Sequence, residues 1–160
     1  MNEEQKQALL MQLQTTRQEL MALLAGCTET MWGTAVYAET SDWTLTDLLR
    51  HLTGAESSMT KLMALIRDGG EGVPEDFDLN RWNARVVQKS QEKTVPNLLA
   101  EMAHNRASLL SFIESLSDDD WDKKGRHGSG QILSIAQICQ LIADHETSHM
   151  QDIRAILGEN

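Results

Sequence analysis

The chain has 160 residues, of which 41% are hydrophobic and 24% are charged. This length and composition predict one globular domain, 1–160, with a single hydrophobic core. The 14 basic and 24 acidic residues give a net charge of −10, and a field of that sign repels phosphate backbones and anionic lipid headgroups. We therefore expect neither nucleic acid nor a membrane surface as a partner.

The sequence also predicts the compartment. Its apolar runs are far shorter than the ~20 residues that a membrane-spanning helix needs, and its N-terminus lacks the basic and apolar regions of a signal peptide. The two cysteines, Cys27 and Cys139, form no C-x-x-C motif. These features indicate a cytoplasmic protein without a disulfide framework.

Apolar residues recur at helical spacing in four segments, which predicts an all-α fold. In the first segment, residues 3–24, the recurring positions are Leu9, Leu13, Leu20 and Leu24. Gly26 follows as the glycine that typically ends a helix.

The second helix has a well-defined start. Thr44 is the expected N-cap, Asp47 completes a capping box, and Trp43 is placed to pack against Leu48. One apolar stripe then follows through Leu45, Leu48, Leu52, Ala55, Met59, Leu62 and Ile66. The sequence Asp68-Gly69-Gly70 ends the helix.

Residues 71–93 form a long connector with a short helix near 79–87. The third long helix opens at Thr94 as N-cap, carries Pro96 in its first turn, and continues to Leu116.

A flexible loop is expected at 125–130, and the fourth helix is expected at 132–157, ended by Gly158. Four such helices predict a four-helix bundle. Because the 71–93 connector is long enough to return along the bundle, we expect an up-down-down-up order with a crossover between helices two and three.

The most informative segment is Asp144-His145-Glu146-Thr147-Ser148-His149. Residues four apart lie on one face of a helix, and His145 and His149 occupy positions on the apolar stripe of the fourth helix. Two imidazoles in the interior need partners, and a pair stacked in this way can bind one divalent metal. Two core histidines bonded to neighbouring groups are the alternative.

His51 is the best candidate for a third ligand. It lies seven residues past Thr44, roughly 10 Å along the helix, and His149 lies eight residues before Leu157, roughly 12 Å from that end. If the second and fourth helices are antiparallel, the two histidines lie at nearly the same level. Three imidazoles leave coordination positions open, which is typical of a catalytic site. Zinc or nickel suits such ligands, with iron as an alternative.

Two other metal sites fit parts of the sequence. The motif H-E-x-x-H is the zincin signature, but only eleven residues follow His149, and Glu146 is expected to face solvent. A di-iron bundle would use two Glu-x-x-His motifs, at Glu101–His104 and Glu146–His149, although His104 falls on a polar stripe.

With these histidines placed, the chain resembles the DinB-like superfamily of metal-binding four-helix bundles. The stretches that carry the resemblance are Trp43-Thr-Leu-Thr-Asp-Leu-Leu-Arg-His51-Leu, Asp78-Leu-Asn-Arg-Trp-Asn83 and Ala143-Asp-His145-Glu-Thr-Ser-His149-Met-Gln-Asp-Ile-Arg154. The resemblance implies one divalent metal held by His51, His145 and His149, and a homodimer. Characterised relatives include bacillithiol S-transferases and mycothiol-dependent maleylpyruvate isomerase. Because the isomerase type carries a further C-terminal domain, the S-transferase type is the closer match by architecture.

The function expected from this resemblance is a metal-dependent transfer of a low-molecular-weight thiol to a small-molecule substrate, or a hydrolase-like reaction. Glu56 is a candidate base or a partner of a ligand, and Asn83 and Trp82 are candidate substrate-binding residues.

Two arginines, Arg85 and Arg126, are candidates to meet an anionic cosubstrate, and His127 is expected in a mobile loop. A metal-bearing bundle without turnover, acting as a binding or stress-response protein, remains an alternative, as does a purely structural bundle.

Overall fold

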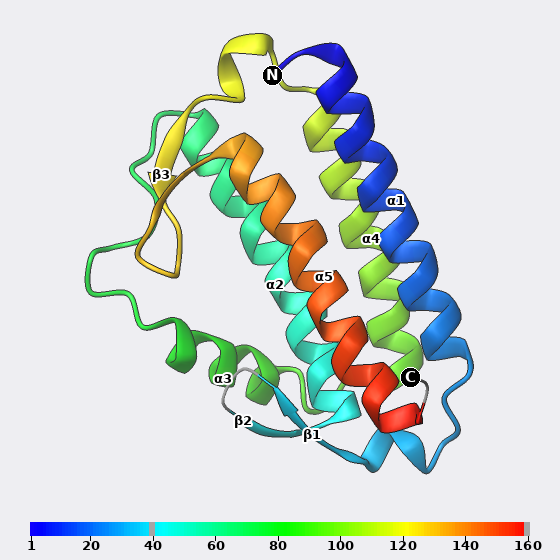
Figure 1. Ribbon diagram of the computed structural model, residues 1–160. Helices are drawn as coiled ribbons and strands as arrows, with labels where there is room; N and C mark the ends of the chain where they lie inside the picture. Colours follow the sequence, from blue (N-terminus) through cyan, green and yellow to red (C-terminus); the bar gives the residue numbers. More distant parts are fainter. Residues whose placement is uncertain (39–40, 159–160) are drawn as a thin grey trace.

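The computed structural model describes residues 1–38 and 41–158. It contains four long helices and one short one, in the order predicted (Figure 1). Their bounds are α1 Glu3–Ala25, α2 Leu45–Arg67, α3 Leu79–Lys89, α4 Val95–Glu114 and α5 Ile135–Leu157.

The four long helices form a bundle with the predicted topology. Helices α1 and α5 run in one direction, and α2 and α4 run together in the opposite direction (Figure 1). Helix α2 packs against α4 and α5, and α1 packs against α5. The all-α, up-down-down-up prediction is confirmed, and α2 and α5 are antiparallel neighbours.

Capping boxes fix the starts of the helices. The Thr44 side chain accepts a hydrogen bond from the Asp47 amide, as predicted, and Thr94 and Asn97 form the same arrangement at α4. At the other end of the chain, Gly158 has a left-handed φ of 71° and ends α5. Gly26 ends α1 with an ordinary right-handed φ of −79°, so this position does not require a glycine.

The fourth long helix is shorter than predicted. Residues Ile132–Ser134 form strand β4, which pairs with β3, Lys124–Arg126, and α5 begins only at Ile135 because Ser134 is its N-cap. The segment that was expected to be a flexible loop is therefore partly a hairpin. A short apolar run such as Ile132–Leu133 suits a strand as well as a helix turn, so the pattern alone misplaced this boundary.

A second hairpin precedes α2 and was not predicted. Strand β1, Ala35–Ala38, pairs with β2, Ser41–Thr44, and Val36 lies opposite Trp43. This pairing fixes the chain at the start of α2. It holds Trp43 in the buried position next to the first turns of that helix.

The crossover between α2 and α4 is tied to the β3–β4 hairpin. The Val73 amide donates to the Arg126 carbonyl at 2.9 Å, and the Arg126 amide donates to the Glu71 carbonyl at 2.7 Å. Gly72, between them, has a φ of 96°, and a Cβ there would lie 2.3 Å from the Arg126 backbone. A glycine is therefore required at this crossing.

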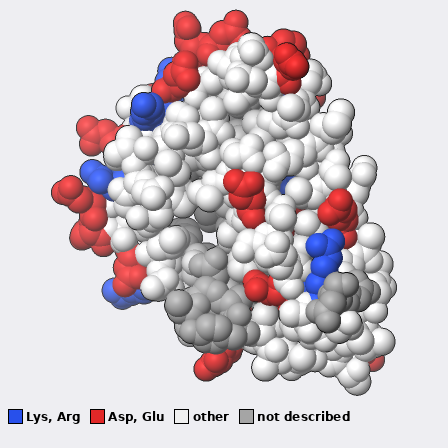
Figure 2. All heavy atoms as spheres, viewed as in Figure 1, with Lys and Arg blue, Asp and Glu red and all other residues white. Residues whose placement is uncertain are grey.

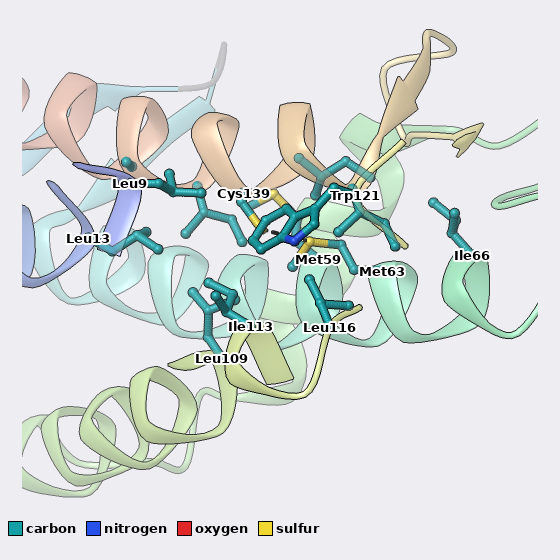
Figure 3. Close-up of a cluster of buried hydrophobic side chains, with 14 residues drawn as sticks. Leu9, Leu13, Met59, Met63, Ile66, Leu109, Ile113, Leu116, Trp121 and Cys139 are labelled. Atoms are coloured by element: carbon teal, nitrogen blue, oxygen red, sulfur yellow. Dashed lines mark hydrogen bonds between the residues drawn. The ribbon is translucent and has the colours of Figure 1, made fainter. Parts of the chain in front are cut away.

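The core divides into two apolar clusters along the bundle. One surrounds the fully buried Trp121 and includes Met63 and Cys139 (Figure 3). The other lies towards the β1–β2 end and includes Leu48 and Met102. Between them, each long helix contributes a buried charged residue. Among the described helices, none is long and apolar enough to cross a membrane.

Candidate metal centre

Three imidazole rings converge in the bundle interior. The Nε2 atom of His145 lies 3.0 Å from Nε2 of His51 and 3.1 Å from Nε2 of His149. Suitable ring nitrogens of all three lie within 4.8 Å of one another. His51, on α2, and His149, on α5, are buried, whereas His145 is half-buried.

The donor set fits one metal ion. A neutral ring nitrogen offers either one proton or one lone pair, so Nε2 of His145 cannot form good hydrogen bonds with both neighbours. A single cation at the centre would satisfy all three nitrogens. In a tetrahedral site with metal–nitrogen distances of about 2.0–2.1 Å, ligand nitrogens are about 3.3 Å apart, close to the two short separations observed here.

Two neighbours orient these rings. The Asp152 carboxylate lies 2.9 Å from Nδ1 of His149, which turns Nε2 of that ring towards the other histidines. The Trp43 ring packs against the His51 ring with centroids 4.9 Å apart. The β1–β2 hairpin and the α2 cap together therefore position the His51 ring.

A buried ion-pair network lies beside the histidines and joins all four long helices. Arg17 of α1 donates to Glu56 of α2 at 2.5 Å and to Glu146 of α5 at 2.7 Å. Arg106 of α4 donates to the same two carboxylates at 2.6 and 2.9 Å. Burial alone would lower the pKa of the Arg17 guanidinium, but the two carboxylates outweigh it and raise that pKa.

This network determines what Glu56 and Glu146 can do. Glu56, expected from sequence as a base or as a partner of a ligand, accepts hydrogen bonds from Arg17 and Arg106 on both oxygens. The expectation that Glu146 faces solvent is wrong, since its side chain is buried between the same two arginines. Both oxygens of Glu146 are engaged by arginines in the interior, so this carboxylate is not placed to act on a reactant, which argues against the zincin mechanism.

The second Glu-x-x-His motif does not reach the interior. His104 is exposed, and Glu101 pairs with Lys93 at the surface at 2.6 Å. Within residues 1–38 and 41–158, the three-histidine group is the only cluster of metal-binding side chains of its kind. The structure therefore gives no support to a di-iron site.

A cavity of about 600 Å³ opens beside His51 and His145. Its walls come from α2, α5, the crossover with α3, and the β3–β4 hairpin. The structure places both Trp82 and Asn83 of α3 in this lining, and their role in substrate binding stays a prediction. Figure 2 shows the hollow on this face, surrounded mainly by uncharged surface, with most acidic groups at the edges of the molecule.

His127 also lines the cavity, a placement that the sequence did not indicate. Its Nδ1 accepts a hydrogen bond from the Ser129 amide at 3.2 Å, so the neutral ring carries its proton on Nε2. Burial is the main cause that lowers the pKa of His127. At neutral pH the ring is therefore an uncharged hydrogen-bond donor.

Neither cysteine lines the cavity. Cys139 is fully buried beside Met63, with the two sulfurs 3.4 Å apart (Figure 3). Burial raises the pKa of the Cys139 thiol to about 12. This thiol is a small core residue and not a nucleophile.

The chain is therefore a four-helix bundle with three histidines that could hold a metal ion in its interior. Residues 12–153 match the family model described as DinB superfamily. The chain belongs to the DinB superfamily. No curated protein matches its sequence.

Solved structures show the same fold at low sequence identity. Mycothiol-dependent maleylpyruvate isomerase aligns with a TM-score of 0.79 and 16% identity over 92% of this chain, and the chain spans 60% of the isomerase's length. YfiT from Bacillus subtilis, described as a probable metal-dependent hydrolase with an unusual four-helix bundle topology, aligns with a TM-score of 0.77 and 17% identity, over 100% of this chain and 91% of YfiT.

A third similar structure corrects one expectation. The colibactin self-resistance protein ClbS, in complex with a dsDNA, aligns with a TM-score of 0.78 and 16% identity, over 96% of this chain and 95% of ClbS. The exclusion of nucleic acid from net charge alone is therefore wrong, because binding depends on the charges at the contact and not on their sum over the molecule. The homodimer implied by the resemblance stays a prediction.

Proposed function

We propose that this protein is a divalent-metal-dependent enzyme with His51, His145 and His149 as ligands, which transfers a low-molecular-weight thiol to an electrophilic small molecule. The observation that carries the proposal is the convergence of three Nε2 atoms at the wall of an open cavity. A structural metal site is normally closed by four protein ligands, whereas three leave room for a reactant.

Zinc or nickel suits three imidazole ligands, and iron is the alternative. A bound divalent ion would supply Lewis acidity, which lowers the pKa of a contacting thiol or water. In thiol transfer, a sulfur–carbon bond forms, the bond from that carbon to its leaving group breaks, and the thiol proton passes to solvent. Water in place of the thiol would make the reaction a hydrolysis.

The chain's own residues supply orientation and hydrogen bonding. Asp152 and Trp43 hold the rings of His149 and His51, and His127 can donate a hydrogen bond to a polar atom of a bound substrate. Since neither cysteine lines the cavity, the sulfur has to come from a cosubstrate. We assign Glu56 to the fixation of α2 through its two arginines, and not to proton transfer.

The test combines elemental analysis with a thiol assay. The wild-type protein and His104→Ala, a surface control, are expected to carry about one metal ion per chain, and His51→Ala to lose it. Consumption of a thiol with 1-chloro-2,4-dinitrobenzene is expected to vanish in His149→Ala. Bound metal without turnover of any thiol or ester tested would indicate a binding protein, and absence of metal from carefully handled protein would overturn the proposal altogether.

A further inference from the structure

The cavity next to the histidines has a distinctive chemical character. Its volume, about 600 Å³, lies within the range of sites that enclose a drug-sized molecule. Nine of its described lining residues are apolar: Ala55, Met59, Leu62, Val73, Phe77, Leu79, Trp82, Leu133 and Leu141. Such a wall favours a ligand that is largely hydrocarbon.

One part of this wall is aromatic. The rings of Phe77 and Trp82 lie 5.7 Å apart at 48°, and Trp82 is 42% exposed although it is a large apolar residue on a mainly polar helix. Packing of the core does not explain why this indole ring is left exposed to solvent. Its exposure towards the cavity makes it a surface on which a flat ring system can pack.

The charges in the lining are equally informative. No lysine or arginine is among the described lining residues, and the one carboxylate is the exposed Asp144. Arg85 and Arg126, which the sequence suggested for an anionic cosubstrate, do not line the cavity, and Arg126 lies 3.7 Å from Glu75 instead. His127 adds no positive charge at neutral pH, since burial lowers its pKa.

Away from the histidine cluster, an anionic group that enters this space would lose water without gaining a cationic partner from the walls. Burial of an unpaired carboxylate is costly, and Asp144 adds repulsion. An uncharged molecule meets neither penalty and still covers the apolar wall.

We propose that the cavity binds an uncharged, largely aromatic or alkyl substrate of drug size and discriminates against anions, with Asp144 as a specificity-determining residue. The substrate body packs between the Phe77–Trp82 pair and the apolar faces of α2 and α5. Its reactive end lies at the three histidines, and only this last assignment rests on the proposed function.

The experiment compares methyl 2-naphthoate with 2-naphthoate, which differ by one negative charge. Binding is measured on the purified protein after removal of metal by chelation, so that zinc cannot itself attract the carboxylate, by calorimetry and by quenching of tryptophan fluorescence. The ester is expected to bind roughly tenfold more tightly or better. Quenching is expected to fall sharply in Trp82→Phe while calorimetric binding of the ester persists, which locates the ligand.

Two carboxylate variants separate the local charge from the overall charge. Asp144→Asn is expected to tighten 2-naphthoate binding several-fold and to leave the ester unchanged. Asp119→Asn, which removes an exposed carboxylate outside the cavity, is expected to change neither. Equal binding of the two compounds by the wild type, or equal effects of the two variants, would overturn the proposal.

The outcome is independent of turnover. Tight ester binding without any thiol consumption would leave this inference standing and remove the proposed function. Thiol consumption that is as fast with carboxylated electrophiles as with neutral ones would overturn this inference and leave the proposed function standing.

Discussion

The Glu56 carboxylate lies in the bundle interior, where it accepts hydrogen bonds from Arg17 and Arg106. The sequence held a signal for this pairing. Each of the four buried charged residues of this network stands at a position where the helical spacing of apolar residues calls for a core side chain, as Arg17 does between Leu13 and Leu20. Which charge pairs with which was not predictable, because it depends on the relative levels of four helices.

Removal of the Glu56 charge is expected to destabilise the protein. Glu56→Gln leaves two buried guanidinium groups with too few acceptors, which costs about 3–5 kcal/mol in the free energy of unfolding. Glu101→Gln is the matched control, since its pair with Lys93 is half-exposed and contributes about 0–1 kcal/mol. Urea denaturation followed by circular dichroism measures both, and similar losses in the two variants would contradict the prediction.

The buried Cys139 thiol makes the free energy of unfolding depend on pH. Its pKa is raised to about 12 in the folded state, against 9.0 for an ordinary thiol. Because the pKa of this thiol is higher in the folded than in the unfolded protein, its burial stabilises the native state fully at pH values below 9. This contribution is lost as the pH rises from 9 towards 12. Wild type is therefore expected to lose more stability than Cys139→Ala between pH 7.5 and pH 10.5, as measured by urea denaturation. Equal losses of stability in the two proteins would show that ionisation of this thiol does not cause the loss of stability at alkaline pH.

At the level of elements, helices were more predictable than hairpins. The capping box of Thr44 and Asp47 and the stripe that follows it fixed α2 almost to the residue. The β1–β2 and β3–β4 hairpins are only three or four residues a strand, too short for a clear alternating pattern. Their position depends on contacts with the bundle, such as the backbone bridge between Gly72 and Arg126.

The packing of α3 on α2 depends on Gly54. A Cβ at this position would lie 2.2 Å from Cγ1 of Val86, so Gly54→Ala is expected to destabilise the protein by about 1–3 kcal/mol and to disturb the Trp82 wall of the cavity. In a Val86→Ala background, where space exists, the same change is expected to stabilise by about 0.5–1 kcal/mol through helix propensity. Thermal denaturation of the four proteins of this cycle is the measurement, and a loss of the same size in both backgrounds would disprove the packing argument.

The three histidines of the candidate metal centre show the same limit of prediction. His145 and His149 were placed on one face by their spacing alone, and the level of His51 followed from helix geometry once α2 and α5 were taken as antiparallel. The cavity beside them was not foreseeable, because its walls come from four separate segments.

At the scale of the whole molecule, a metal ion bound by the three histidines would link α2 and α5, which are far apart in the sequence. Because the histidines converge only in the folded protein, zinc at about 100 times its Kd is expected to add about 2.7 kcal/mol to the free energy of unfolding. Differential scanning calorimetry should show a rise in Tm for wild type and His104→Ala, and a fall after chelation. A similar rise in His149→Ala would show that zinc binds elsewhere.

The parallel arrangement of α2 and α4 has a consequence for the shape of the molecule. In an alternating bundle a few residues would suffice to turn from one helix to the next, and the outer side of α2 and α5 would be bare. Here the chain has to travel back along the bundle, and this return brings Phe77 and Trp82 over the side on which His51 and His145 open. The unusual helix order therefore supplies one wall of the chamber that would enclose a bound molecule.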